Sequence, residues 1–304
     1  MTGVKLSFAQ RLAQKIDTTG TVLCVGIDPH PMLMHPLFGG SDAALGTPQT
    51  LGHLETFCIE LIEAATGRVP AVKPQVALFE QHGPEGMRVL AEISRTAREA
   101  GLLVIMDAKR GDIGSTADAY ASAWLGPDAV FPSDALTINP YLGGDSLMPF
   151  ILRAADTGSG LFILVRTSNG GSRDIQQQEI EGLPVWAHLA RLLAPVINEY
   201  IDEQAGFSSI GIVAGATGPV EARALRAELP SAPFLIPGYG AQGASASDAL
   251  SGLITHHQGR VTGGLVNSSR GISNCHAAQA ASDMGGWRMA VANALTHAIN
   301  DLAS

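Results

Sequence analysis

The sequence has few cysteines, no long hydrophobic run and no strong targeting signal. Its three cysteines are widely spaced and include no Cys-x-x-Cys pair, which indicates neither a disulfide framework nor a zinc knuckle. No apolar run approaches the roughly 18 residues of a membrane span, and the amphipathic N-terminal segment lacks the unbroken apolar centre of a signal peptide. We therefore expect a soluble, cytoplasmic protein in a reducing compartment, with no membrane partner.

Charged residues are also scarce, and the basic ones are outnumbered. Lys, Arg, Asp and Glu make up 15% of the 304 residues, well under the roughly 25% of an average soluble protein. The 19 basic and 28 acidic side chains give a net charge of −9. Nucleic acids and anionic membranes require a basic surface that displaces counterions or meets lipid phosphates. We therefore expect no nucleic-acid partner, and a small molecule is the better default.

What the sequence does contain is a series of eight short runs rich in Val, Ile and Leu, separated by stretches with helical spacing. Their lack of polar alternation is typical of strands buried on both faces of a parallel sheet. The runs are 21–28, 71–79, 102–109, 135–140, 161–167, 208–215, 233–237 and 263–268. Although the length would also allow two smaller domains, eight β-then-α units without a linker favour one (β/α)8 TIM barrel over residues 1–304.

Two segments exceed the usual loop length of such a barrel. Residues 29–48 could contain a short helix, and residues 169–182 are either a mobile flap or a plain insertion. Active sites of this architecture lie on the loops that follow the strands, at their carboxyl ends. We therefore look for chemistry among the polar residues at those ends.

The third predicted strand ends in a local concentration of charge, Asp107-Ala-Lys109-Arg110-Gly-Asp112. Strand alternation puts Asp107 and Lys109 on the same face, where they would form a desolvated pair at the barrel mouth. A structural salt bridge or a solvated turn is the alternative. Their position at the mouth favours a functional role.

Two further charged residues stand at strand positions. Lys73 lies within an otherwise apolar run, where a lone ammonium group is unfavourable, and its natural partner is Asp107 on the neighbouring strand. Asp28 precedes Pro29 at the end of the first strand. It is either a turn-forming acid or a substrate ligand, and the residues alone leave both open.

A glycine-rich segment follows the seventh predicted strand, and Gly238-Tyr-Gly240-Ala-Gln242-Gly243 matches the dinucleotide pattern GxGxxG. The acidic residue expected about 20 positions later is missing, because residues 249–270 contain no Asp or Glu. What remains is a turn whose backbone N–H groups can face an anion. Barrels commonly bind phosphate after strands seven and eight, where Arg270 is either a phosphate ligand or an ordinary exposed arginine.

The known catalytic motifs are otherwise missing. The nine histidines show no metal-binding spacing, and the sequence has no nucleophile elbow, P-loop or paired acidic metal cluster. We therefore expect no metal and no cofactor. The residues favour cofactor-free chemistry on a phosphorylated small molecule.

Taken together, these residues resemble the orotidine 5′-phosphate decarboxylase family, and residues 107–116 are similar to its longer bacterial subgroup. The residues that carry the resemblance are Asp28, Lys73, Asp107-Ala-Lys109-x-x-Asp112-Ile113, Pro237-Gly-Tyr-Gly-Ala-Gln242 and Arg270. The resemblance extends from the first predicted strand to the eighth. It implies a carboxy-lyase that converts orotidine 5′-monophosphate to uridine 5′-monophosphate, the last step of de novo pyrimidine nucleotide synthesis, without a cofactor.

The resemblance also implies a role for each matching residue. Lys73, Asp107, Lys109 and Asp112 match the family's alternating charge network. In that network Lys109 would protonate the carbon that loses carbon dioxide, and Asp107 would crowd the departing carboxylate. Asp28 and Lys73 match ligands of the ribose hydroxyls. The other expected substrate-binding residues are Ser168 at the pyrimidine ring, Gln242 and Arg270 at the phosphate, and Ile113, Thr116, Pro237 and Gly240.

In the family, Asp112 and Thr116 reach into the active site of the partner subunit, so the resemblance implies a homodimer with two shared sites. One departure is visible. The subgroup usually has a proline after Ser168-Asn169, where this sequence has Gly170-Gly171. This difference leaves the conformation of residues 169–182 open.

Two rival functions share parts of the pattern. A sugar-phosphate decarboxylase or aldolase-like relative would share Asp-x-Lys-x-x-Asp and would use a metal-bound enediolate. It needs an acidic metal ligand beside the motif and does not explain Ser168 or Gln242. A non-catalytic phosphate-binding barrel is the other rival, and it would gain nothing from Asp107 and Asp112.

Overall fold

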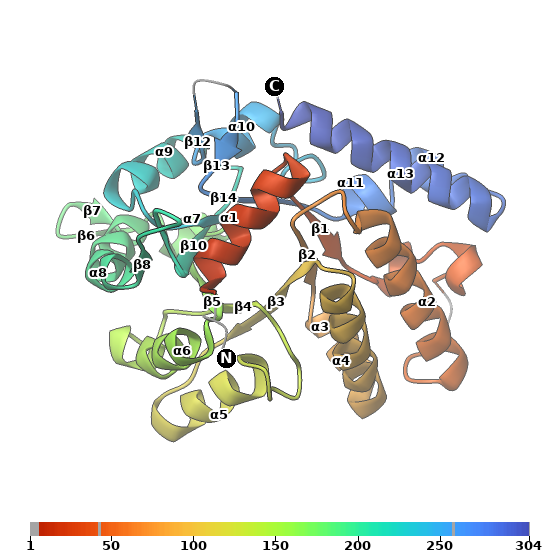
Figure 1. Cartoon of the computed structure of the whole chain (residues 1–304), viewed down its shortest axis with the longest axis horizontal. Helices are drawn as coiled ribbons and strands as arrows, with labels where there is room; N and C mark the ends of the chain where they lie inside the picture. Colours follow the sequence, from red (N-terminus) through yellow and green to blue (C-terminus); the bar gives the residue numbers. More distant parts are fainter. Residues whose placement is uncertain (1–5, 42–43, 257–258, 304) are drawn as a thin grey trace.

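The computed structural model describes residues 6–41, 44–256 and 259–303, and it is a closed barrel of eight parallel strands (Figure 1). The strands follow one another around the barrel in chain order, and β1 pairs with both β2 and β14 to close it. They are β1 (Leu23–Ile27), β2 (Ala71–Pro74), β3 (Leu103–Arg110), β4 (Ala135–Ile138), β5 (Gly160–Arg166), β10 (Ile210–Ala214), β11 (Phe234–Ile236) and β14 (Gly264–Ser268). The predicted TIM barrel and its eight strands are confirmed.

Helices cover the outside of the barrel because each carries one apolar stripe that packs on the strands. In α4, for example, the buried residues include Val89, Leu90, Ile93 and Ala97. The longer outer helices are α2 (Pro48–Ala65), α4 (Gly83–Glu99), α5 (Gly114–Trp124), α6 (Gly144–Thr157), α8 (Val185–Glu199), α9 (Pro219–Glu228) and α13 (Met284–Asp301). Among the described residues, no helix is long and apolar enough to cross a membrane.

Short elements fill the connections. The short helices are η1 (Pro31–Leu33), η2 (Pro36–Phe38), α3 (Ala77–Glu80), α7 (Ser172–Ile175), α10 (Ala246–Leu250), α11 (Arg270–Ser273) and α12 (His276–Gln279). The short strands form the hairpins β6 (Glu179–Ile180) with β7 (Leu183–Pro184), β8 (Ile201–Asp202) with β9 (Phe207–Ser208), and β12 (Ile254–Thr255) with β13 (Val261–Thr262). The two long segments singled out in the sequence therefore contain η1 and η2 in the first, and α7 and β6 in the second.

The second strand is shorter than predicted. We expected it to reach Phe79, but it ends at Pro74, and the apolar residues that follow form the single turn α3. Proline has no N–H to donate to a neighbouring strand, and Val76 already has helical dihedral angles. An apolar run alone cannot distinguish a strand from a short buried helix.

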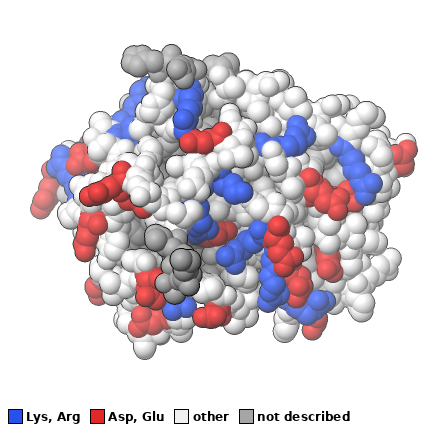
Figure 2. Space-filling model, viewed as in Figure 1, with Lys and Arg blue, Asp and Glu red and all other residues white. Residues whose placement is uncertain are grey.

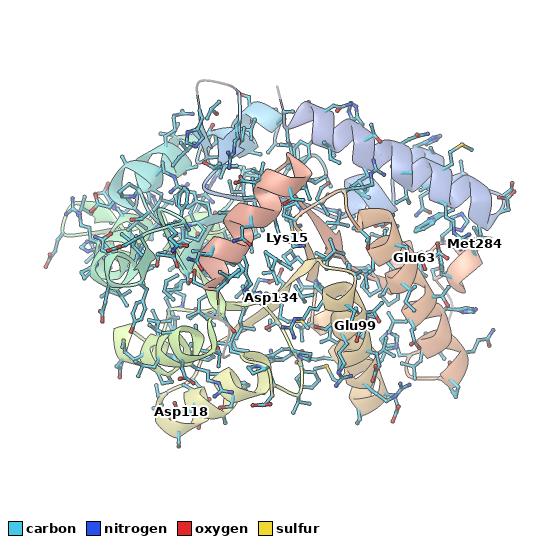
Figure 3. The ribbon with its side chains drawn as sticks, in the orientation of Figure 1. Lys15, Glu63, Glu99, Asp118, Asp134 and Met284 are labelled. Carbon is cyan, nitrogen blue, oxygen red and sulfur yellow. The ribbon has the colours of Figure 1, made fainter. Side chains whose placement is uncertain are left out.

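The amino-terminal end of the barrel is closed by α1 (Phe8–Thr19), which lies across it in Figure 1. The ring of Phe8 packs edge-on against Phe162 of β5, with ring centroids 5.9 Å apart. Asp134, which precedes β4, lies beside α1 in Figure 3 and pairs with Arg11 of that helix. Acidic and basic side chains are interspersed among uncharged ones over this face of the molecule (Figure 2). The carboxyl ends of the strands are thus left open at the other end.

Candidate active site

A cavity of about 450 Å³ lies at the carboxyl ends of the strands. It is lined by eight of the residues predicted from the sequence: Asp28, Lys73, Asp107, Lys109, Ser168, Pro237, Gln242 and Arg270. They come from the ends of six different strands, β1, β2, β3, β5, β11 and β14. A further cavity of about 530 Å³ lies at the opposite end beside α1, where Asp17 and Arg260 of its lining pair with each other. The first cavity therefore holds the cluster of charged residues.

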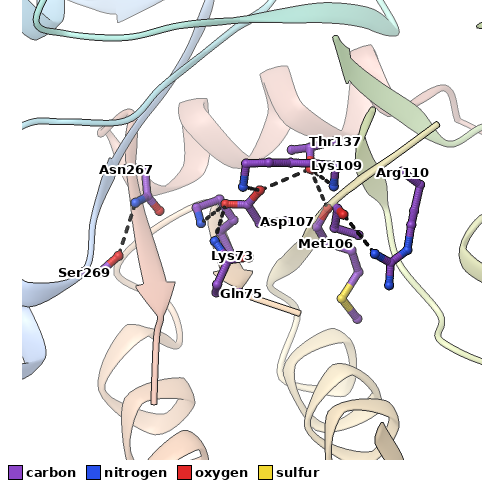
Figure 4. Close-up of polar contacts among 10 residues, drawn as sticks. Lys73, Gln75, Met106, Asp107, Lys109, Arg110, Thr137, Asn267 and Ser269 are labelled. Atoms are coloured by element: carbon purple, nitrogen blue, oxygen red, sulfur yellow. Dashed lines mark hydrogen bonds and ion pairs between the residues drawn. The ribbon is translucent and has the colours of Figure 1, made fainter. Parts of the chain in front are cut away.

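Asp107 is the centre of this cluster and accepts four hydrogen bonds (Figure 4). Its Oδ2 lies 2.6 Å from Nζ of Lys73 and 3.1 Å from Nε2 of Gln75. Its Oδ1 lies 2.5 Å from Nζ of Lys109 and 3.1 Å from Oγ1 of Thr137. Each carboxylate oxygen thus has one ammonium donor and one neutral donor, which fixes the carboxylate in both position and orientation.

The charges of Asp107 and Lys73 depend on each other. Burial alone would raise the pKa of Asp107, but the ammonium groups of Lys73 and Lys109 outweigh it and hold that pKa well below its usual range. Burial alone would lower the pKa of Lys73, but Asp107 and then Asp28 outweigh it and raise that pKa. Both groups are therefore charged at neutral pH.

The two lysines differ in their access to the cavity. The side chain of Lys73 is 4% exposed, whereas that of Lys109 is 46% exposed. Lys109 also has a positive backbone φ of 50°, a conformation that is uncommon for a residue other than glycine. The pairing of β3 with β4 is irregular at this point, between Met106 and Arg110. Of the two ammonium groups that line the cavity, that of Lys109 is therefore on the more exposed side chain.

Asp28 and Asn267 each keep a buried oxygen without a hydrogen bond among the described residues, Oδ1 in both cases. Both residues line the cavity. Asp28 follows β1 and Asn267 lies on β14, and these two strands pair with each other. Gly26 of β1 makes room for the side chain of Ser269, because a Cβ at position 26 would lie 1.9 Å from Oγ of Ser269. Buried acceptors of this kind are usually satisfied by a donor, and a ligand's hydroxyl group would supply one.

The glycine-rich turn after β11 forms another wall of the cavity. Gly238, Gly240 and Gly243 all have positive φ angles, of 107°, 70° and 88°, which explains why the sequence has glycine at these places. Gln242 lines the cavity, whereas Gly240 lies outside its lining. No long helix follows this turn, since α10 has five residues. The rejection of a dinucleotide-binding fold from the sequence agrees with this geometry.

Ser168 lies where β5, β10 and β11 end. A Cβ on Gly215 would lie 2.8 Å from the Ser168 backbone, and one on Gly238 would lie 3.1 Å from its Cβ. Beyond Ser168, the segment 169–182 is tied back to β5. The side chain of Gln176 accepts from the backbone N–H of Thr167 at 2.8 Å and donates to its hydroxyl at 2.7 Å. The segment is therefore anchored at its base, and its exposed strand β6 pairs with β7, which follows it.

Besides Gly240, three predicted site residues lie outside the lining of the cavity. Asp112, Ile113 and Thr116 stand after β3, at the start of α5. The Asp112 carboxylate accepts from the backbone N–H of Ile113 at 2.8 Å, and the Ile113 side chain is 58% exposed. These residues are therefore not part of the cavity of their own barrel.

The cavity also contains polar residues that the sequence analysis missed. They are Gln75, Thr137, Thr167, Asn169, Asn267 and Ser269. Gln75 stands two residues after Lys73, so strand alternation could have placed it on the same face. Thr137 is a polar residue within the buried strand β4, which was a weaker signal. Among the described residues, no group of three or more His, Cys, Asp or Glu side chains could hold a metal ion.

Comparisons with known proteins agree with the resemblance seen in the sequence. The family described as orotidine 5′-phosphate decarboxylase / HUMPS matches residues 21–283. An orotidine 5′-phosphate decarboxylase of Rhodopirellula baltica is 41% identical over 94% of this chain and 95% of its own length. The crystal structure of a Streptomyces avermitilis protein, provisionally named as the same enzyme, is similar with a TM-score of 0.79, at 36% identity over 100% of this chain and 99% of that one. The structure of Leishmania donovani OMP decarboxylase is similar with a TM-score of 0.71, at 32% identity over 98% and 99%.

Proposed function

The chain belongs to the orotidine 5′-phosphate decarboxylase / HUMPS family, and from this premise we propose that it converts orotidine 5′-monophosphate to uridine 5′-monophosphate and carbon dioxide. This reaction is the last step of de novo pyrimidine nucleotide synthesis. The observation that carries the proposal is the group of charges at the cavity, where Asp107 lies between Lys73 and Lys109. The relatives named as this decarboxylase support it over nearly the whole chain.

The proposed chemistry uses this group of charges directly. Loss of carbon dioxide breaks the bond between the ring carbon and the carboxylate and leaves the electron pair on that carbon. Lys109 then donates a proton to the carbon and regains one from solvent. Asp107 lies beside the substrate carboxylate and crowds it, while Lys73 keeps Asp107 ionised. Because the ammonium group of Lys109 is already in place, it stabilises the developing negative charge without reorganisation.

The remaining residues bind the parts of the substrate that do not react. Asp28 and Lys73 bind ribose hydroxyls, and the buried free oxygen of Asp28 supports this assignment. Ser168 contacts the pyrimidine ring. Binding energy from such remote contacts is available to lower the barrier at the reacting carbon. The phosphate end is formed by Gln242, Arg270 and the turn that contains Pro237 and Gly240.

We further propose that the enzyme acts as a homodimer in which Asp112 and Thr116 complete the partner's site, with Ile113 beside them. The position of these residues outside their own cavity supports the proposal. So do the exposed apolar side chains of Ile113, Tyr141 and Leu142, which follow the neighbouring strands β3 and β4 and are 58%, 80% and 50% exposed. A cytoplasmic location remains a prediction.

A sugar-phosphate relative that uses a metal ion fits the cavity less well. The two oxygens of Asp107 already accept from two ammonium groups and two neutral donors, and a metal ion would have to displace some of them. A simple phosphate-binding barrel would not require this carboxylate at all.

The direct test is turnover of orotidine 5′-monophosphate by the purified protein in the presence of a chelator. The substrate's ultraviolet absorbance should fall at an enzyme-dependent rate that added divalent metal ions do not increase. Lys109→Ala protein, prepared in the same way, should show no turnover. Absence of turnover by the wild-type protein would overturn the proposed function, and activity that depends on metal ions would favour the sugar-phosphate alternative.

A further inference from the structure

Thr137 connects the carboxylate of Asp107 with the backbone of Lys109 in the proposed site. It lies on β4, its side chain is buried, and it contacts both Asp107 and Lys109 (Figure 4). Its Oγ1 is 2.9 Å from the backbone nitrogen of Lys109 and 3.1 Å from Oδ1 of Asp107. The charged motif of β3 does not include Thr137, which lies on the neighbouring strand. The residues that carry the resemblance to known enzymes do not include it either.

The direction of both hydrogen bonds follows from the chemistry of the hydroxyl group. The backbone N–H of Lys109 can only donate, so it uses a lone pair of the Thr137 oxygen. The single hydroxyl proton then has two acceptors within reach, Oδ1 of Asp107 at 3.1 Å and the carbonyl oxygen of Met106 at 3.4 Å. The carboxylate is both closer and charged, and charged acceptors form the stronger hydrogen bond. Thr137 therefore accepts from Lys109 and donates to Asp107.

The backbone of Lys109 needs such support. Its φ of 50° is unfavourable for a residue with a side chain, and the regular pairing between β3 and β4 is interrupted at this place. A conformation of this kind persists only where the surrounding structure determines it. The Thr137 hydroxyl replaces the missing strand partner of the Lys109 N–H, and so it fixes the direction in which the lysine side chain leaves the backbone.

We propose that Thr137 is a positioning residue for the decarboxylation, because its hydroxyl group holds Asp107 and Lys109 in one fixed relative geometry. The inference rests on the proposed function. It assigns to Thr137 no contact with the reacting atoms. Its effect is on the chemical step, since the ribose and phosphate contacts are made by other residues, on β2 and after β1, β11 and β14.

The test uses Thr137→Val, which keeps the shape of the side chain and removes both hydrogen bonds. We expect kcat to fall by about 10- to 100-fold, which is less than the roughly 100- to 1,000-fold loss when a donor that touches the reacting atoms is removed. We expect KM, and the affinity for uridine 5′-monophosphate measured by calorimetry, to change by less than about threefold. Thr137→Ser keeps the hydroxyl group and should recover most of kcat.

A matched control separates this effect from general destabilisation. Thr157, the last residue of α6, is also buried, and its hydroxyl donates to the carbonyl oxygen of Arg153 at 2.7 Å. Thr157→Val also removes a buried hydroxyl but lies away from the cavity, so kcat should remain at the wild-type value. If Thr137→Val does not fold, Thr137→Ala replaces it and should show the same loss of kcat.

The outcomes distinguish this inference from the proposed function. An inactive wild-type protein would contradict the function itself. An active wild-type protein with unchanged kcat in Thr137→Val, or with a loss of kcat that Thr137→Ser does not recover, would overturn the role of Thr137 alone. So would weaker binding of uridine 5′-monophosphate accompanied by no loss of kcat.

Discussion

At the scale of single residues, Asp107 holds two ammonium groups at fixed distances from one carboxylate. Lys73 is buried and Lys109 is half-exposed, so the same acid stabilises one lysine inside the barrel and orients the other toward the cavity. The pair with Lys73 also affects folding. Removing one partner of a buried ion pair leaves the other charge buried and uncompensated, which is strongly destabilising.

The pair between Asp107 and Lys73 contributes to stability over a wide range of pH. The pKa of Asp107 is lower in the folded protein than in the unfolded chain, where it is about 3.9. Its contribution is therefore present above that pH and is lost as the pH falls. The pKa of Lys73 is higher in the folded protein than its unfolded value of about 10.4. Its contribution is therefore complete below that pH and is lost as the pH rises further, so the wild-type pair contributes fully from about pH 5 to pH 9.

Asp107→Asn should reverse this behaviour for Lys73. Without the Asp107 carboxylate, we expect burial to outweigh the remaining effect of Asp28 and to lower the pKa of Lys73 in the folded state. The unfolded chain then binds more protons, and stability rises with pH. We expect a loss of about 3–5 kcal/mol in the free energy of unfolding at pH 7, and a smaller loss at pH 9.5. Urea denaturation of the variant and the wild type at both pH values measures these two losses.

The control for that experiment is Glu85→Gln, which breaks the exposed pair with Arg88 on α4. Exposed pairs of this kind contribute little to stability, so this variant should match the wild type at both pH values. An equal loss at pH 7 and pH 9.5 in Asp107→Asn would show that Lys73 does not titrate in the variant.

At the scale of elements, α1 closes the end of the barrel opposite the proposed site. Its first turn is held by a capping box in which Ser7 and Gln10 bond each other's backbone N–H groups. Phe8 then enters the bottom of the barrel over Gly160, the first residue of β5. A Cβ on Gly160 would lie 2.2 Å from the Phe8 ring, so glycine is required here for close packing.

Gly160→Ala should therefore destabilise the protein by about 1–3 kcal/mol, the usual effect of overpacking a core, without changing kcat. Gly52 provides a control of opposite sign. It lies within α2 with nothing within 4 Å of an added Cβ, so Gly52→Ala should stabilise the helix by roughly 1 kcal/mol.

A double variant tests the contact itself. In Phe8→Ala protein the destabilising effect of Gly160→Ala should disappear, because the ring that the added methyl group contacts is gone. Urea denaturation of the four variants checks this, and an unchanged effect of Gly160→Ala without Phe8 would rule out the contact.

The strands also explain what the sequence could and could not predict. Apolar runs located all eight strands, because each strand is buried on both faces. They did not locate where β2 ends, since the residues after Pro74 remain apolar in a helical turn. Lys73, Asp107 and Lys109 were recognisable because charges within buried runs are rare. Thr137 was not, because its role depends on an irregular register between β3 and β4 that the sequence does not specify.

At the scale of the whole molecule, the barrel separates stability from chemistry. The amino-terminal end is filled by α1, and the carboxyl-terminal end holds the charged cavity. After β3, Asp112 stands just before α5 and Thr116 lies in its first turn, and the exposed Tyr141 and Leu142 follow β4. A second copy of the chain that covers these apolar residues would bring its own Asp112 to the neighbouring cavity. The proposed site would then be complete only in the dimer.

Subunit mixing tests this arrangement directly. Lys109→Ala and Asp112→Ala should each be inactive alone. In a hybrid dimer, one site combines both defects and the other contains neither of them. Random exchange of equal amounts makes half of the dimers hybrids, and each has one intact site of two, so we expect about a quarter of the wild-type activity.

The control for subunit mixing uses two defects that lie in the same cavity of one chain. Lys109→Ala mixed with Asp107→Ala leaves one defect in each site of the hybrid, so no activity should return. Gel filtration of each variant before mixing establishes that it forms dimers, and subunit exchange is started by brief dilution in mild denaturant. Recovery in the first mixture and not in the second requires that Asp112 acts across the interface, because only then does an intact site form in the hybrid. Equal results in the two mixtures would place Asp112 in the site of its own chain.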